Sequence, residues 1–147
     1  VAGVAEKAAG RIGHLVFLDA YVLENGQSVG DQVGPEIMAG MVQAAKVYGD
    51  GWRIAHDPPD ADRRTDQALK PILTPLVVKD PQASQLPRTF IYCKQGAQDI
   101  GALYLPIAQA AEKAQGDGSW RYRELETGHM PMWTAARELA DLLLELA

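Results

Sequence analysis

The chain has 147 residues, which suits a single domain, and 47% of them are hydrophobic, which is enough for a buried core. The formal net charge of −5 gives no electrostatic support for binding to nucleic acid or to an anionic membrane. No apolar run approaches the roughly 18 residues that a membrane span needs. Cys93 is the only cysteine, which excludes an internal disulfide framework and favours a reducing, cytoplasmic location. Because the chain begins at Val1, a signal peptide removed beforehand stays an open alternative.

Two elements are predicted at the N-terminal end. Residues 1–12 are rich in Ala and Gly and predict a helix without an N-cap, so we expect that further chain preceded it. Residues 14–20 predict a strand, since LVFL is a continuous apolar run typical of a strand that is covered on both faces. Asp19 follows this run, and burying a carboxylate there is costly unless it is paired.

The segment from about residue 22 to 86 predicts a small helical insertion between two strands. Asn25-Gly26 predicts a turn, and Pro35 predicts the start of a helix. Residues 52–64 are expected to be irregular, and a second short helix is predicted over residues 65–73. The apolar stripe of the first of these helices consists of Ile37, Met41, Ala44 or Ala45, and Tyr48.

The remainder of the chain predicts two strands and two helices. Residues 88–94 and 120–125 predict strands, and residues 102–115 predict the helix between them. Thr134 is the expected N-cap of a final helix. The apolar face of that helix, which must pack on a sheet, consists of Leu139, Leu142, Leu143 and Leu146.

Helices and strands therefore alternate along the chain, which predicts an α/β fold with a mostly parallel sheet and flanking helices. Three strands are too few to cover both edges of such a sheet. We therefore expect this chain to be the second half of a larger α/β domain, with the first half as its partner.

The segment WRYRELETGHMPM at residues 120–132 carries the first candidate for chemistry. It predicts a strand, a tight turn at Thr127-Gly128 in which Gly128 has a positive φ, and then His129. Open α/β sheets place their ligands and reactive groups beyond the carboxyl ends of their strands. The local pattern leaves two alternatives open, a catalytic histidine and a histidine that only caps a turn.

Four segments that span nearly the whole chain carry a resemblance to a known family. They are GVAEKAAGRIGHLVFLDAYVLENGQS at 3–28, GDGWRI at 49–54, LPRTFIYCK at 86–94 and WRYRELETGHMPMWTAARELADLLLELA at 120–147. The chain resembles the C-terminal half of an α/β-hydrolase, closest to the bacterial relatives of plant methylesterases, salicylate-binding esterases and hydroxynitrile lyases. The resemblance implies a G-x-S-x-G nucleophile a few residues before Val1, because the first helix looks like the one that follows the nucleophile elbow.

The resemblance implies that His129 is the base of a Ser-His-Asp triad. The acid is open between two residues. Many family members carry it just after the strand that TFIYC resembles, where the matching position is Gly96. Asp99 lies three residues later, whereas Asp19 ends the neighbouring strand. We favour Asp19, because a strand end holds a catalytic group more rigidly than a Gly- and Gln-containing loop does.

The resemblance also places the insertion, as a cap domain, over the site. The apolar substrate pocket is then expected to be lined by Met130, Met132, Trp133, Met38, Met41 and Trp52. Ser28 and Ser84 lie in loop-like segments and are expected to form turns. His56 lies among Asp57, Asp60 and Asp62, which indicates a solvated acidic loop rather than a metal site.

The implied activity is that of a serine hydrolase, an esterase that acts on small apolar carboxylic esters without a cofactor or metal. This chain is expected to be inactive without the half that carries the nucleophile and the oxyanion hole. Two alternatives remain open, a hydroxynitrile-lyase-type enzyme that uses the same triad and a small-ligand receptor or carrier that has lost turnover. The oligomeric state, a homo-oligomer included, is also open.

Overall fold

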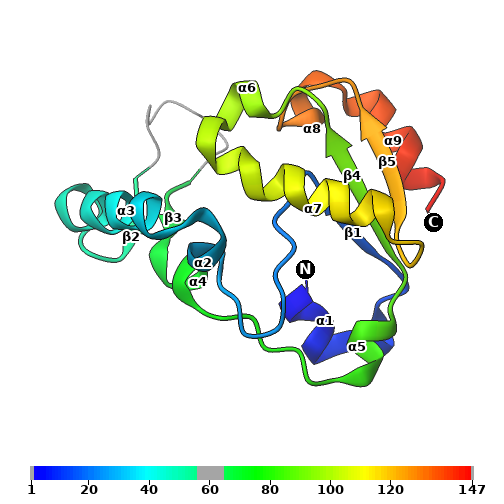
Figure 1. Ribbon diagram of the computed structural model, residues 1–147, viewed down its shortest axis with the longest axis horizontal. Coiled ribbons are helices and arrows are strands. Elements are labelled where there is room, and N and C mark those ends of the chain that lie inside the picture. Colours follow the sequence, from blue (N-terminus) through cyan, green and yellow to red (C-terminus); the bar gives the residue numbers. More distant parts are fainter. Residues whose placement is uncertain (1, 56–64, 147) are drawn as a thin grey trace. The chain divides into compact units, whose positions relative to one another are not determined.

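The computed structural model describes residues 2–55 and 65–146 (Figure 1). Contacts divide the chain into two compact units. The first, which we call the sheet unit, comprises Val1–Val22 and Val77–Ala147. The second, which we call the insert unit, is Leu23–Leu76. Among the described residues, no helix has both the length and the apolar character needed to cross a membrane.

A parallel three-stranded sheet organises the sheet unit, as the alternating pattern predicted. The strands are β1 (Leu15–Leu18), β4 (Arg88–Cys93) and β5 (Arg121–Leu125), in the order β1-β4-β5. All of their pairings are parallel. The central strand β4 is the most deeply buried, with Phe90 and Ile91 fully shielded from solvent. Its β-branched and aromatic side chains suit a strand packed on both faces.

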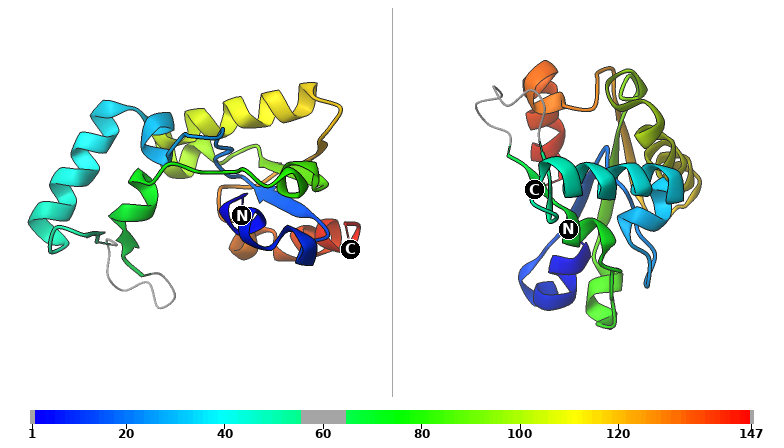
Figure 2. Two further views of the ribbon diagram at one scale, coloured as in Figure 1. Left: turned by 90° about the horizontal axis from the view of Figure 1, so that it is seen from below. Right: turned by 90° about the vertical axis from the view of Figure 1, so that its left-hand side faces the viewer.

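Helices cover both faces of this sheet. Helix α7 (Leu105–Gly116) buries Ile107, Ala111 and Ala114, which lie on one face at i, i+4 and i+7, in the same core as Phe90. Helix α9 (Ala136–Leu144) buries Leu139 in a separate core with the Ile91 side chain. Because successive residues of β4 point to opposite faces, these helices must lie on opposite sides, which Figure 2 shows for yellow α7 and orange-red α9.

The other helices of the sheet unit are short. At the N-terminal end, α1 (Ala2–Ala8) and η1 (Ala9–Arg11) contact α5 (Pro81–Gln85). The Glu6 carboxylate fixes this contact by accepting the backbone N–H groups of Lys79 and Asp80 at 2.7 and 2.9 Å. The remaining helices follow the ends of β4 and β5 and are α6 (Ala97–Ile100), η2 (Gly101–Tyr104) and α8 (Pro131–Thr134).

The insert unit has its own small core of Val33, Met38, Ala45 and Leu69. Its elements are α2 (Val29–Val33), α3 (Pro35–Tyr48), β2 (Arg53–Ile54), β3 (Gln67–Ala68) and α4 (Leu69–Leu73). Pro35 begins α3, as expected, and Gly26 has a φ of +88° in the predicted turn. The backbone of Gly26 and Gln27 pairs with Leu76 at 2.7 Å, so the two ends of the unit lie side by side.

Several boundaries of the insertion differ from the prediction. The unit ends at Leu76 rather than near residue 86, because α5 packs with α1 in the sheet unit. The antiparallel pair of β2 and β3 replaces the first part of the helix predicted from residue 65. Tyr48 is 73% exposed, so the predicted stripe of α3 stops short of its last turn, and the buried face runs through Met38 instead.

The predicted starts of two helices in the C-terminal half were also wrong. Thr134 does not cap α9, which begins at Ala136; its hydroxyl instead lies 2.5 Å from the Thr127 hydroxyl. Leu143 is 41% exposed, so only the Leu139 and Leu142 part of the predicted stripe packs on the sheet. The helix expected from residue 102 starts at residue 105, because the preceding turn is a 3-10 helix.

Candidate active site

Asp19 lies directly beyond the carboxyl end of β1, within the sheet unit. Its backbone N–H donates to the Ile91 carbonyl at 2.7 Å and so continues the β1-β4 ladder by one bond. The residue has a φ of +42°, a left-handed conformation that Asp tolerates better than most side chains. This turn of the backbone directs the carboxylate into the protein, where Asp19 is only 1% exposed.

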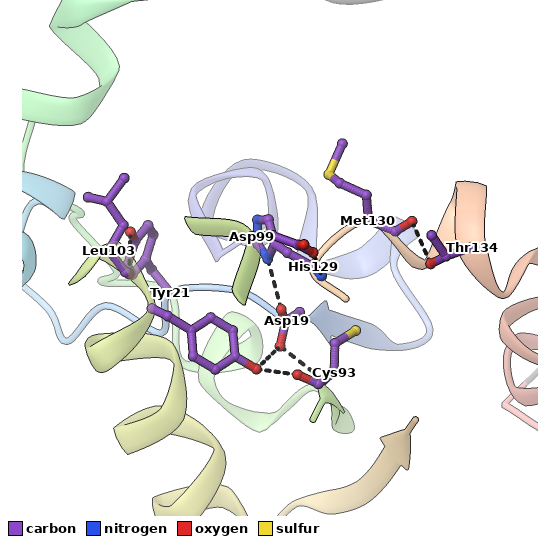
Figure 3. A network of polar contacts seen from close by, with 9 residues as sticks. Asp19, Tyr21, Cys93, Asp99, Leu103, His129, Met130 and Thr134 are labelled. Atoms are coloured by element: carbon purple, nitrogen blue, oxygen red, sulfur yellow. Dashed lines mark hydrogen bonds and ion pairs between the residues drawn. The ribbon is translucent and has the colours of Figure 1, made fainter. Parts of the chain in front are cut away.

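Three donors surround the Asp19 carboxylate. Oδ1 accepts the Cys93 backbone N–H at 3.0 Å and the Tyr104 hydroxyl at 3.1 Å. Oδ2 lies 2.8 Å from Nδ1 of His129, a contact that is drawn as a dashed line in Figure 3. Hydrogen bonds to a charged acceptor contribute about 1.5–3 kcal/mol each, which offsets the cost of burying the carboxylate. The separation between Oδ2 and Nδ1 is that of a hydrogen bond, as expected if Asp19 rather than Asp99 contacts the ring.

His129 lies in the loop that follows β5, and the backbone directly after β4 holds that loop by hydrogen bonds. The Lys94 N–H donates to Leu125 O, and the Gln95 N–H donates to Thr127 O, both at 3.0 Å. The His129 side chain is 27% exposed. Because Nδ1 faces a carboxylate, the neutral ring carries its proton on Nδ1 and leaves Nε2 as an acceptor. No partner of Nε2 is found among the described residues.

Asp99, the alternative acid, contacts the same histidine at a different place. Its Oδ2 accepts the backbone N–H of His129 at 2.6 Å and makes no described bond to the ring. This contact also explains Gly128, for which we predicted a positive φ that the structure does not have. A Cβ at position 128 would collide with Oδ2 of Asp99. A side chain at position 128 would therefore have to displace the Asp99 carboxylate, whereas the backbone conformation does not demand a glycine.

Gly96, the position at which the resemblance implied an acid, is also constrained by space. Its φ and ψ of −60° and −28° are open to any residue. A Cβ at this position would collide with the Tyr104 ring and would lie 2.8 Å from Oδ2 of Asp19. The place from which a carboxylate after β4 would reach the histidine is therefore filled by Tyr104 and Asp19.

The pKa shifts at the site have burial as their largest cause. Burial, with the Asp19 charge next in importance, raises the pKa of the Cys93 thiol to about 12, so this thiol is neutral at physiological pH. The pKa of Tyr104 is also raised, with burial as the largest cause, a hydrogen bond with Tyr92 as the second and the Asp19 charge as the third. Tyr104 therefore keeps its proton and remains a hydrogen-bond donor.

The remaining residues singled out in the sequence fall into three groups. Within the sheet unit, Met130 is half-buried, whereas Met132 and Trp133 are exposed beside His129 in the chain. Within the insert unit, Met38 is buried, Met41 is half-buried and Trp52 is exposed. His56 and the acidic residues around it lie outside the described residues. Elsewhere, across residues 2–55 and 65–146, no group of acidic, His and Cys side chains suits a metal ion.

Ser28 lies in the sequence Gly26-Gln27-Ser28-Val29-Gly30, which has the spacing of G-x-S-x-G. The structure assigns it a local role, since its hydroxyl accepts the Asp31 N–H and caps α2. A nucleophile elbow places a strained serine between a strand and a helix. Ser28 has an ordinary extended backbone, with a φ of −104°, and no strand precedes it in the insert unit as described.

No model of a protein family matches the chain, and no curated protein matches its sequence. Solved structures do match. A pyrethroid hydrolase from Sphingobium faniae JZ-2 is 17% identical, with a TM-score of 0.70, and the match covers 98% of this chain and 64% of that one. An extracellular alpha/beta-hydrolase from a Paenibacillus species, described as sharing structural and functional homology with tobacco salicylic acid binding protein 2, is 21% identical, with a TM-score of 0.68.

The match to the Paenibacillus protein covers 97% of this chain and 64% of that one. The structure of pyrethroid hydrolase PytH with BIF matches at 15% identity, with a TM-score of 0.66 and the same 64% share. This chain therefore has an α/β-hydrolase fold and spans about 64% of the length of the solved structures that it matches. Its parallel sheet and flanking helices correspond to the 64% of those structures that the match covers.

Proposed function

We propose that this chain supplies the base and the acid of a Ser-His-Asp triad in an enzyme that hydrolyses small apolar carboxylic esters. The observation that carries the proposal is the 2.8 Å contact between Asp19 Oδ2 and His129 Nδ1 beyond the carboxyl ends of parallel strands. The α/β-hydrolase fold of structures named as hydrolases supports hydrolysis as the reaction class.

The arrangement of His129 suits general-base chemistry. Nε2 takes the proton of a serine hydroxyl while the serine oxygen attacks the ester carbonyl. The same nitrogen then returns the proton to the departing alcohol, which leaves an acyl-enzyme. A water molecule repeats both steps and releases the carboxylic acid. Asp19 holds the ring in the tautomer that keeps Nε2 as the acceptor, and it stabilises the imidazolium that forms.

The serine and the oxyanion hole belong, in this proposal, to a segment outside the present sequence. Ser28 and Ser84 do not fit the role, because each has a local bond: Ser28 caps α2, and the Ser84 hydroxyl donates to Pro81 O at 2.8 Å. Met130, Met132 and Trp133 follow His129 in the chain, and we propose that they contribute apolar surface for the acyl or alcohol group. The insert unit is proposed as the cap of this site.

A fluorophosphonate probe on the complete protein separates an enzyme from a receptor or carrier on the same fold. We expect one serine to be labelled, and mass spectrometry should locate it outside residues 1–147. A protein that leaves the probe unreacted, or that is labelled at Ser28 or Ser84, would contradict the proposal.

Removal of the base gives the quantitative test. In the complete protein, His129→Ala should lower kcat on a model ester by roughly 10⁴ to 10⁶. His14→Ala is the matched control, because His14 precedes β1 at the opposite end of that strand from Asp19 and bonds the Thr89 hydroxyl at 2.8 Å. A loss of tenfold or less in His129→Ala, with the fold intact, would place the base elsewhere.

A further inference from the structure

Tyr104 is the contact of Asp19 that the sequence did not indicate. It ends η2, a turn that precedes α7, and it is only 4% exposed. Its hydroxyl lies 3.1 Å from Asp19 Oδ1 and also bonds the Cys93 carbonyl. The buried tyrosine keeps its proton, and this one proton is shared between two acceptors, Asp19 Oδ1 and the Cys93 carbonyl oxygen.

The atoms around the Tyr104 hydroxyl suit a carboxylate that comes from the end of β1. Oδ2 of Asp19 faces the ring of His129, so Oδ1 is the oxygen left for the protein to hold. The Cys93 N–H at the end of β4 and the Tyr104 hydroxyl are the donors to Oδ1. Gly96 leaves room for them, because any side chain there would displace the Tyr104 ring or the Asp19 carboxylate.

We propose that Tyr104 is the positioning residue of the acid: its hydroxyl, together with the Cys93 N–H, holds Asp19 Oδ1 so that Oδ2 stays on His129. This inference rests on the proposed function, since it assigns a supporting role within the same site. Tyr104 does not touch the reacting atoms. It acts through Asp19, in the space that a side chain at position 96 would otherwise take.

Tyr104→Phe tests the role, because it removes one oxygen and keeps the ring. We expect kcat of the complete protein on a model ester to fall roughly ten- to a hundred-fold, with KM unchanged. Tyr21→Phe is the matched control, since the Tyr21 hydroxyl also bonds a backbone carbonyl, Leu103 O at 2.9 Å, but has no described bond to Asp19. It should leave kcat within about twofold of the wild type.

A double-mutant cycle separates positioning from general damage to the fold. If Tyr104 acts only through the acid, Tyr104→Phe should change kcat by less than about twofold once Asp19→Asn is present. An undiminished loss in that background would overturn the inference, and so would a Tyr104→Phe variant that is as active as Tyr21→Phe. If Asp19→Asn itself has no effect on an active enzyme, it is the proposed function that fails.

A second readout does not depend on turnover and decides the case if no ester is hydrolysed. The proton on Nδ1 of His129 should give a slowly exchanging ¹H NMR signal in the wild type, because Asp19 shields it from solvent. We expect Tyr104→Phe to broaden or remove this signal, as Asp19→Ala should, and Tyr21→Phe to keep it. A wild-type signal in Tyr104→Phe would contradict the positioning role.

Discussion

Two carboxylates hold His129 at two different places. Asp19 bonds the ring nitrogen, and Asp99 bonds the backbone N–H. The first contact sets the tautomer and the direction of the ring, whereas the second fixes the loop from which the side chain projects. This division explains why both acids lie near the histidine although only Asp19 is suited to act as the acid of a triad.

Gly128→Ala tests the loop contact. The new Cβ would collide with the Asp99 carboxylate, so the variant should displace that carboxylate and lower kcat of the complete protein about tenfold or more. In an Asp99→Ala background the added methyl group finds space, and Gly128→Ala should then cost less than about twofold. Steady-state kinetics of the four proteins decide this, and equal losses in both backgrounds would show that position 128 acts through its backbone.

The sequence predicts residue contacts that follow from strand ends and misses those that depend on tertiary packing. The Asp19 contact was predictable because a carboxylate after a buried strand needs a partner, and His129 offered one. Tyr104 was not, because it reaches Oδ1 only through the turn between α6 and α7. The positive φ predicted for Gly128 was wrong because local turn rules ignore Asp99, which lies 29 residues away.

At the scale of elements, the site is assembled around the end of β4. Cys93, its last residue, gives its N–H to Asp19 and its carbonyl to Tyr104. The next two residues, Lys94 and Gln95, donate their N–H groups to Leu125 O at the end of β5 and to Thr127 O just beyond it. One strand end therefore fixes the positions of Asp19, of Tyr104 and of the loop that carries His129, because the parallel order β1-β4-β5 brings these segments to the same edge of the sheet.

Element boundaries were predicted less well than element types. Helix α9 was expected from Thr134, since Thr is a common N-cap, but the short helix α8 and the bond to Thr127 occupy that residue. The pairing of β2 with β3 joins two-residue strands that are too short to show a period in the sequence. Both errors come from contacts between segments that local patterns do not contain.

The insert unit leads to a prediction about ester preference. Because we propose that the insert unit is the cap of the site, Met41→Ala and Trp52→Ala should change the ratio of kcat/KM between short- and long-chain esters. The loss of stability should be small, because Met41 is partly exposed and Trp52 is largely exposed. Met38 is buried in the core of the unit, so Met38→Ala should instead cost about 2–5 kcal/mol in the free energy of unfolding. An unchanged ester preference in the first two variants would leave the insert unit a purely structural role.

At the scale of the whole molecule, β1 is an edge strand of the described sheet, with β4 as its only strand neighbour there. Exposed apolar side chains also remain on helices of the sheet unit, among them Val4, Leu105 and Leu144. The solved structures that this chain matches are longer, since the match covers 64% of each. We expect further chain to cover these surfaces in the complete protein.

Residues 1–147 expressed alone should therefore bind a hydrophobic dye or associate, because an open strand edge and exposed apolar side chains favour both. Dye fluorescence and sedimentation of the isolated chain measure this, with the complete protein as the control. A soluble monomer that binds no dye and melts in one sharp transition would show that the chain is sufficient as a domain.

The central claim is that Asp19, and not Asp99, is the acid that serves His129. The most direct measurement is kcat on a model ester for Asp19→Asn and Asp99→Asn in the complete protein. Asp19→Asn keeps the shape of the site but removes the carboxylate that selects the tautomer, so kcat should fall by roughly 10³ to 10⁴. Asp99→Asn keeps an oxygen that can accept the His129 N–H and should lose no more than a few-fold. The reverse order of these two losses would contradict the account.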